Sequence, residues 1–138
     1  MRKIFLDTNI ILDLLAQRIP HYESIARIAT LAEQRELALI ASPVSFTTIS
    51  YVLSKIEPFE VVLNRLRKFS ILCKISEVNQ ETIDKSLNSD FSDFEDAVQY
   101  FSAVDAGCKI ILTRNTRDFK KSGIPVMTAD EYLKSRSF

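Results

Sequence analysis

The chain has 138 residues, of which 46% are hydrophobic and 26% charged, and its 18 basic residues balance its 18 acidic ones. This composition excludes a disordered chain, and the neutral balance excludes nucleic-acid binding through overall positive charge. Two glycines are too few for a Gly-rich phosphate loop, and no apolar run approaches the roughly 20 residues of a membrane span.

The position of Asp7 and the spacing of the cysteines indicate the cellular compartment. Asp7 comes too soon in the chain for the apolar core of a signal peptide. Cys73 and Cys108 have no neighbouring Cys or His, so they predict reduced core thiols rather than a metal motif or a disulfide framework. His21, the single histidine, has no catalytic partner and is expected at the surface. We therefore expect a cytoplasmic protein that forms one domain over residues 1–138.

The first half of the chain alternates short apolar runs with segments of helical periodicity. Residues 3–6 are too few for a helix and predict a buried strand, after which Asp7-Thr8-Asn9 predicts a helix start. The other elements predicted here are a helix over 22–35, a strand over 37–41, a helix over 44–53, a helix from Pro58 to Phe69 and a strand over 71–75.

The second half continues this alternation. A weaker helix is predicted over 81–87, and Ser92 with Glu95 matches a capping box that begins the next helix, which Gly107 ends. The remaining elements are a strand over 109–112, a loop over 113–123, a short strand over 124–127 and a terminal helix from 128. The pattern predicts an α/β fold: a three-layer α/β/α sandwich around a mostly parallel sheet of four or five strands.

Acidic residues gather where such a sheet would bind a ligand, at the carboxyl ends of its strands. Asp7 follows the first strand, Asn115 and Asp118 lie in the loop after the fourth, and Asp96 lies near the start of the preceding helix. Carboxylates that crowd together need a cation to stay ionised, and oxygen ligands without His or Cys suit Mg²⁺ or Mn²⁺. If these regions converge, they predict a metal site.

Each acid also has a structural interpretation. Asp7 could serve only as a helix N-cap, Asp93 and Asp96 could complement a helix dipole, and Asp118 could be an ordinary loop acid. Glu95 is interpreted as the capping-box partner. The acids interpreted as parts of solvated helix faces are Asp13, Glu23, Glu33 and Glu36.

Three motifs stand in order along the chain. Residues 4–9 read Ile-Phe-Leu-Asp-Thr-Asn, residues 93–97 read Asp-Phe-Glu-Asp-Ala, and residues 110–119 read Ile-Ile-Leu-Thr-Arg-Asn-Thr-Arg-Asp-Phe. Together they resemble the motifs of the PIN-domain family over nearly the full length of the chain. The resemblance implies the PIN-like sandwich and a metal-dependent nuclease.

The resemblance also implies which residues bind the metal. They are Asp7, Asp96 and Asp118, with Asn115 at a position that is often Asp or Asn and Asp93 as an auxiliary. The family usually carries a Glu in the helix after the second strand, where alignment places Thr48 in this chain. A hydroxyl is a weaker ligand than a carboxylate, so one metal position is either lost or filled through water.

The predicted reaction is hydrolysis of an RNA phosphodiester, with the aspartates as metal ligands rather than nucleophiles. The basic residues around Asp118 either contact RNA phosphates or form a solvated loop; they are Arg114, Arg117, Lys120 and Lys121. Many short bacterial PIN proteins are VapC-type toxins, so the resemblance also implies a small antitoxin partner and a homodimer.

Three other functions stay open at this point. One is a housekeeping PIN ribonuclease, and another is a PIN-like nucleic-acid-binding module with weak or no catalysis, which Thr48 favours. The third is a phosphatase with Asp7 as its nucleophile. The last is weakened by Asn9, because that chemistry would need Asp at this position.

Overall fold

The computed structural model describes residues 1–136, and its centre is a sheet of five strands that all run parallel to their neighbours. The strands are β1 (Lys3–Leu6), β2 (Ala38–Ala41), β3 (Cys73–Ile75), β4 (Ile110–Leu112) and β5 (Val126–Met127). They lie in the order β3-β2-β1-β4-β5, so β1 is central. The predicted α/β fold with a parallel sheet is confirmed.

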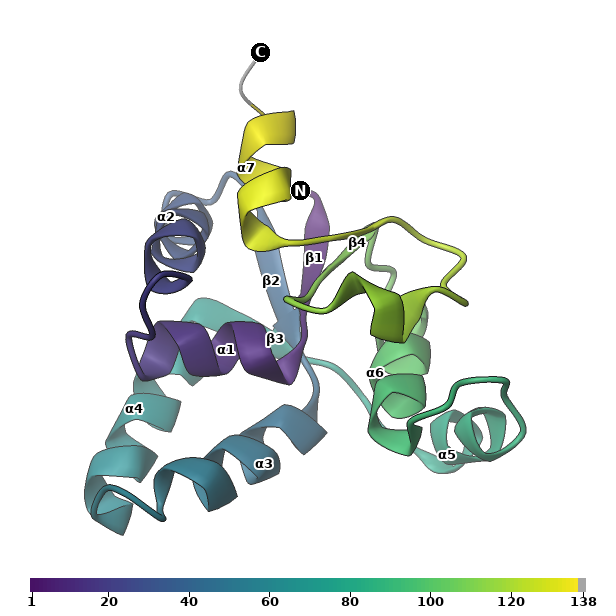
Figure 1. Cartoon of the computed structure of the whole chain (residues 1–138), viewed down its shortest axis with the longest axis horizontal. Coiled ribbons are helices and arrows are strands. Elements are labelled where there is room, and N and C mark those ends of the chain that lie inside the picture. The colour runs from purple at the N-terminus through teal and green to yellow at the C-terminus, as the bar shows by residue number, and fades with distance from the viewer. Residues whose placement is uncertain (137–138) are drawn as a thin grey trace.

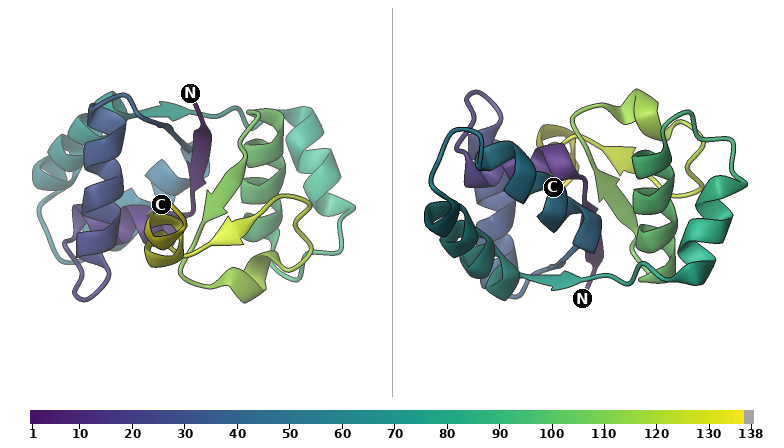
Figure 2. Two further views of the ribbon diagram at one scale, coloured as in Figure 1. Left: turned by 90° about the horizontal axis from the view of Figure 1, so that it is seen from above. Right: turned by 90° about the horizontal axis from the view of Figure 1, so that it is seen from below.

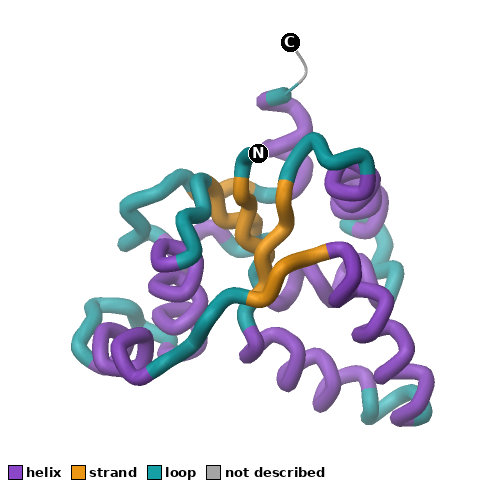
Figure 3. Tube along the Cα trace, turned by 180° about the vertical axis from the view of Figure 1, so that it is seen from behind, coloured by secondary structure: helices purple, strands orange, loops and turns teal. Residues whose placement is uncertain are grey.

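Helices cover both faces of the sheet and complete the three predicted layers. They are α1 (Thr8–Leu15), α2 (Tyr22–Glu33), α3 (Pro43–Leu53), α4 (Phe59–Leu72), α5 (Gln80–Leu87), α6 (Phe94–Asp105) and α7 (Ala129–Ser135), with a 3-10 helix, η1 (Thr116–Phe119). Figure 1 shows α1 to α4 on one side of the strands and α5 and α6 on the other. The views from above and below in Figure 2 show these layers apart from one another. In the view from behind, the strands lie between the two groups of helices (Figure 3). No helix within residues 1–136 is long and apolar enough to cross a membrane.

The alternation of side chains along β1 explains why this run is apolar throughout. Ile4 and Leu6 point into a core shared with α1, α2, α3, α4 and α7, whereas Phe5 points into a second core with Ile111 and Phe119. Successive strand residues face opposite sides, so a central strand that is covered on both faces needs apolar residues at every position. Burial of each of these side chains contributes about 1.5–3 kcal/mol, which anchors the strand from which the first motif extends.

The predicted boundaries differ from the observed ones at the edges of the sheet. The strand predicted over 71–75 begins only at Cys73, because α4 continues to Leu72. The strand predicted over 124–127 is limited to Val126–Met127. Both are edge strands with a single neighbour, so pairing extends only as far as that neighbour provides hydrogen bonds.

The helix α6 begins one residue later than the predicted capping box requires. The N-cap is Asp93, whose Oδ1 accepts a hydrogen bond from the backbone N–H of Asp96 at 3.0 Å, so the prediction that Ser92 caps and Glu95 reaches back is wrong. Aspartate caps a helix as well as serine does, and spacing alone could not choose between neighbours. The predicted end is confirmed, because Gly107 follows the helix with a φ of 77°, in the left-handed region that favours glycine.

Candidate active site

The site lies where the order of strands reverses, between β1 and β4. Leu6 pairs with Leu112 in the sheet, and the backbone N–H of Asp7 continues the ladder by donating to the carbonyl of Leu112 at 2.9 Å. The segments that follow β1 and β4 therefore start side by side at the carboxyl edge, which is where parallel α/β sheets bind ligands.

Asp7 is held rigidly at this edge. Asp7 is 6% exposed to solvent. Its Oδ1 accepts from the backbone N–H of Thr8 at 2.9 Å and from Nε2 of Gln99 at 3.4 Å, and its Oδ2 accepts from the Thr113 hydroxyl at 2.8 Å. Asp7 also caps α1, so the two interpretations of this residue are compatible: one carboxylate begins the helix and faces the site.

A buried polar network lies beneath Asp7 and joins three helices. Gln99 of α6, which is 0% exposed, donates to the Ser45 hydroxyl of α3 at 3.0 Å and to the Thr8 hydroxyl of α1 at 3.3 Å. The two hydroxyls share a hydrogen bond of 2.7 Å. Sequence analysis missed Gln99 and Ser45. The available signal was that Gln99 lies three residues after Asp96, on the same helix face, among otherwise apolar positions.

Beside Asp7 is a hollow of about 330 Å³ that we call the acidic hollow. Its lining residues are Asp7, Thr8, Asn9, Leu12, Asp93, Glu95, Asp96 and Asp118. Five of these eight side chains are acidic, so the fold brings together four of the predicted site residues, from the N-cap of α1, from η1 and from the N-cap and first turn of α6. Two predicted residues do not line it. Asn115 is exposed in the turn before η1, and Thr48 is half-buried on α3.

Glu95 is an acid of the hollow that sequence analysis assigned to a cap. Its Oε2 accepts from the Thr8 hydroxyl at 3.3 Å, and the side chain is half-buried. Because Asp93 provides the cap, Glu95 is free to turn toward α1. The hollow thereby gains a carboxylate from α6 that the sequence analysis did not count among its ligands.

Burial and mutual repulsion raise the pKa values of three of these acids. Burial, followed by repulsion from Asp7, Asp93, Asp118 and Glu95, raises the pKa of Asp96 to about 7. Burial also raises the pKa of Glu95, with smaller contributions from Asp7 and Asp93. Burial raises the pKa of Asp7 most, and Asp118 adds to it, although hydrogen bonds from Thr113, Thr8 and Gln99 oppose the shift. The hollow thus holds more negative charge than its surroundings neutralise.

The donor set of the acidic hollow fits a hard divalent cation in kind. It offers carboxylate and hydroxyl oxygens with no histidine or cysteine, and its uncompensated charge is what such a cation would neutralise. Within residues 1–136, however, no three His, Cys, Asp or Glu side chains are already arranged closely enough to enclose an ion. Carboxylates at the open side would therefore turn inward to complete a coordination shell.

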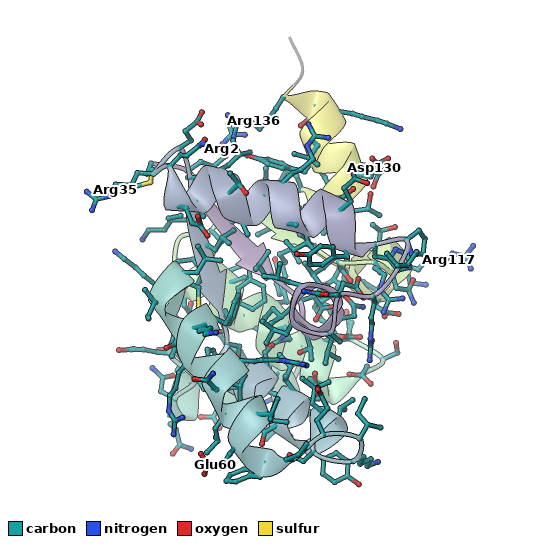
Figure 4. The ribbon with its side chains drawn as sticks, turned by 90° about the vertical axis from the view of Figure 1, so that its left-hand side faces the viewer. Arg2, Arg35, Glu60, Arg117, Asp130 and Arg136 are labelled. Atoms are coloured by element: carbon teal, nitrogen blue, oxygen red, sulfur yellow. The ribbon has the colours of Figure 1, made fainter. Side chains whose placement is uncertain are left out.

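The predicted basic residues divide into two kinds. Arg117, Lys120 and Lys121 are exposed and lie within three residues of Asp118 in the chain, and Figure 4 shows Arg117 extending outward from the body. Arg114 instead forms an ion pair with Asp13 of α1, with 2.9 Å between Nε and Oδ2. Asp13 is 0% exposed, so its interpretation as part of a solvated face is wrong: the helix turns this acid toward the loop after β4. His21 is exposed, as expected.

Comparison with known proteins identifies relatives of this chain. A family model described as PIN domain matches residues 3–117. Ribonuclease VapC1 of Aquifex aeolicus (strain VF5) is 31% identical over 136 residues, which cover 94% of this chain and 92% of that protein.

Solved structures share the fold at lower identity. DNA-bound VapBC from Salmonella typhimurium has a TM-score of 0.69 and 16% identity, covering 94% of this chain and 99% of that one. The sarcin-ricin loop cleaving toxin VapC20 of Mycobacterium tuberculosis has a TM-score of 0.68 and 14% identity, covering 88% of this chain and 95% of that one. With the family model and the curated relative both spanning most of its length, the chain belongs to the PIN domain family.

Proposed function

We propose that this protein is a divalent-metal-dependent endoribonuclease and the toxin of a type II toxin–antitoxin pair. The observation that carries the proposal is the acidic hollow: a buried, fully hydrogen-bonded Asp7 at the strand-order reversal, surrounded by further carboxylates with no cation of the protein among the lining residues. The relative named a ribonuclease, which covers nearly the whole chain, supports RNA as the substrate.

Asp7, Asp96 and Asp118 would hold Mg²⁺ or Mn²⁺, with Asp93 and Glu95 at the rim of the same hollow. The ion would supply an activated water and offset the negative charge that develops on the phosphate. The protein contributes orientation, because Thr113 and Gln99 fix the Asp7 carboxylate in one position. Asn115 contributes through its backbone: its main-chain carbonyl accepts a hydrogen bond from the backbone N–H of Asp118 at 3.1 Å, which shapes the turn that presents this acid.

The raised pKa of Asp96 gives this side chain a second property. At about 7, it leaves the carboxyl protonated in a large fraction of molecules near neutral pH when no cation is present. A bound cation favours the ionised form, so binding should release protons. The carboxyl group of Asp96 is therefore a position in the hollow at which a proton can be exchanged near neutral pH.

RNA would approach across the rim formed by Arg117, Lys120 and Lys121. These side chains are exposed and lie next to Asp118 in the chain. Long cationic side chains at a rim bind backbone phosphates without reading sequence, and a local patch of this kind suits a protein with no net charge.

For partners, we propose a small antitoxin and a homodimer. Structures that share this fold include VapBC2 from Rickettsia felis bound to a DNA fragment from its promoter and a toxin–antitoxin complex from Klebsiella pneumoniae. Both cysteines of the chain are free thiols, which suits the cytoplasm, where such pairs would act. Co-purification from the native cells would test the partner, and light scattering would test the dimer.

A second candidate function is a PIN-like RNA-binding module without catalysis. Thr48 favours it, because α3 provides no carboxylate at that position. The two functions separate in one experiment: purified protein is incubated with RNA and Mn²⁺, with Mg²⁺, or with EDTA, beside the variants Asp96→Asn and Asp118→Asn. We expect cleavage with metal that both variants lose. A folded protein that neither cleaves RNA nor binds Mn²⁺ in calorimetry would leave only the binding module.

A further inference from the structure

A second hollow, of about 440 Å³, lies beside the acidic one and has no role in the function proposed so far. Its polar lining residues are Asp13, His21, Ser24, Arg114, Thr128 and Asp130. Its size falls within the roughly 300–1,000 Å³ of ligand pockets. The two hollows adjoin, because the side chain of Asn9, which lines the acidic hollow, accepts a hydrogen bond from the backbone N–H of Arg114 at 3.3 Å. We call the second one the Arg114 hollow.

The lining of the Arg114 hollow contains a buried carboxylate, that of Asp13, whose charge is balanced by an ion pair. Asp13 is 0% exposed, and neither of its oxygens has a well-aligned hydrogen bond to any described residue. Its partner is Nε of Arg114 at 2.9 Å. A buried carboxylate without a cation beside it is strongly unfavourable, so Asp13 keeps the Arg114 side chain in place.

This arrangement leaves the outer end of Arg114 available. The ion pair uses Nε, while the terminal Nη1 and Nη2 groups form no hydrogen bond or ion pair with any residue of 1–136, and 35% of the side chain is exposed. A guanidinium whose inner edge is fixed presents its terminal N–H groups as a pre-oriented fork, which matches the oxygens of a phosphate.

The charge around the hollow also favours an anion. Asp130 is exposed to solvent, which screens its charge, and it pairs with Lys134, with 3.1 Å between Nζ and Oδ2. Asp13 interacts with Arg18 and His21 as well as with Arg114, so this single buried acid faces more than one basic group. The hydroxyls of Ser24 and Thr128 add neutral donors to the same lining.

We propose that the Arg114 hollow is a phosphate subsite that binds a backbone phosphate of the RNA next to the one in the acidic hollow. Arg114 contacts the phosphate, and Asp13 is a positioning residue that acts through Arg114. This inference rests on the proposed function for its ligand, RNA. It distinguishes Arg114 from Arg117, Lys120 and Lys121, which form no ion pair with a buried acid among residues 1–136.

The test measures RNA binding without cleavage. A fluorescently labelled single-stranded RNA of mixed sequence is titrated with protein in EDTA at several salt concentrations, and anisotropy gives the dissociation constant. Arg114→Gln should weaken binding several-fold and reduce the slope of log K against log salt by about 0.7, the value for one phosphate contact on a single strand. Arg67→Gln, a change of the same type at an exposed position of α4 that lines neither hollow, should change neither quantity.

Two further variants test the role of Asp13. Asp13→Asn should weaken RNA binding, and combining it with Arg114→Gln should weaken binding no further than Arg114→Gln alone. If Asp13 acted only through its charge, removing the anion would tighten binding, which would overturn the positioning role. Arg114→Lys keeps the charge but lacks the fork, so full affinity in this variant would also overturn it. Thermal unfolding of each variant ensures that only folded protein is compared.

The outcomes separate this proposal from the nuclease proposal. RNA binding that depends on Arg114 in a protein that never cleaves supports the subsite and contradicts only the catalytic function. Cleavage by a protein whose RNA affinity and salt slope are unchanged in Arg114→Gln supports the nuclease and overturns the subsite. Absence of any RNA binding by the unmodified protein overturns the subsite directly.

Discussion

Two buried aspartates at opposite ends of α1 occupy contrasting environments. Asp7 is 6% exposed and Asp13 is 0% exposed, and burial raises the pKa of both. Asp7 receives hydrogen bonds from neutral donors on both oxygens and faces other carboxylates, whereas Asp13 has almost no hydrogen bonding and faces Arg114. Burial alone therefore does not identify a functional acid. The groups around each buried acid identify its role. Neutral donors orient Asp7 without balancing its charge, whereas the charge of Asp13 is already balanced by Arg114.

The largest difference between Asp7 and Asp13 is expected in RNA cleavage after each charge is removed in turn. Asp7→Asn should reduce metal-dependent RNA cleavage by more than about a hundredfold, because loss of a supporting residue in a metal site already costs about 10- to 100-fold. Asp13→Asn should reduce it far less, through weaker RNA binding. Single-turnover assays with saturating protein would separate these effects. Substantial cleavage by Asp7→Asn would mean that the two aspartates are not functionally distinct.

The next largest effect is expected at Gln99, which supports only the Asp7 side. Gln99→Leu removes the donor to Asp7, Thr8 and Ser45, so Mn²⁺ affinity should fall by about 10- to 100-fold and stability by about 1–3 kcal/mol. Calorimetry and urea unfolding measure the two quantities. The matched control is Gln80→Leu, at an exposed position of α5. Unchanged Mn²⁺ affinity in a folded Gln99→Leu protein would mean that the network supports packing only.

The stability of the metal-free protein should fall in neither aspartate variant. Burial raises the pKa of Asp13 in spite of Arg114, so the cost of burying this charge exceeds the attraction of the ion pair, and Asp13→Asn should leave the free energy of unfolding unchanged or higher. Asp7→Asn relieves repulsion, and the Thr113 hydroxyl can rotate to accept from the new amide, so its stability should also be unchanged or higher. Urea unfolding in EDTA measures both, and a loss of stability in Asp13→Asn would mean that the ion pair outweighs the cost of burial.

Periodicity predicted most of this fold because it reports which face of each element is buried. The apolar run before Asp7 and the helical spacing after it were sufficient for the order of elements. They left the convergence of Asp7, Asp96 and Asp118 conditional, and the structure places these three acids around one hollow. What periodicity lacks is the identity of the group that another element brings to a face. From the sequence, Asp13 is predicted to be solvated, because the pattern does not show that the loop after β4 places Arg114 against it. In the same way, Gln99 is only a polar residue within an apolar stretch of helix, because the pattern does not show that α1 and α3 place hydroxyls around it.

Choices between neighbouring residues were also beyond the sequence. Ser92 and Asp93 are both good caps, and only the backbone geometry at Asp93 decides between them, which in turn frees Glu95 for the acidic hollow. The roles of the site residues as metal ligands and RNA contacts stay predictions, which the experiments on Asp7, Asp96 and Arg114 address.

A smaller effect is expected from placing an acid at Thr48, the position at which the sequence analysis predicted a missing carboxylate. Thr48 lies three residues after Ser45, which contacts the network beneath Asp7, so positions 45 and 48 share a helix face. Thr48→Glu should place a carboxylate near the acidic hollow and tighten Mn²⁺ binding several-fold, measured by calorimetry. Thr47→Glu, at the exposed neighbouring position, is the control. Weaker folding with no gain in Mn²⁺ affinity would mean that Glu95 already completes the set of acids.

The smallest effect concerns pH and follows from Asp96, whose pKa rises from 3.8 to about 7 on folding, first through burial and then through repulsion from Asp7. The folded protein therefore binds a proton at this carboxyl at a higher pH than the unfolded chain does. The stabilisation is fully present below about 3.8 and is lost as the pH rises through about 7, so the metal-free protein should become more stable as the pH falls from 8 to 5. Saturating Mn²⁺ should reverse this trend, because the ion competes with the proton and binds better at high pH.

Thermal unfolding between pH 5 and 8.5, in EDTA and in Mn²⁺, measures both slopes and their difference. Asp96→Asn should flatten the EDTA profile, while Asp90→Asn, at an exposed position outside the acidic hollow, should leave it as it was. The shift should amount to only a few degrees, since Asp96 is half-buried and solvent screens part of the repulsion. Metal-free protein that loses stability between pH 8 and 6 would mean that the acids of the hollow repel one another too weakly to require a cation, and the contrast between Asp7 and Asp13 would lose its electrostatic basis.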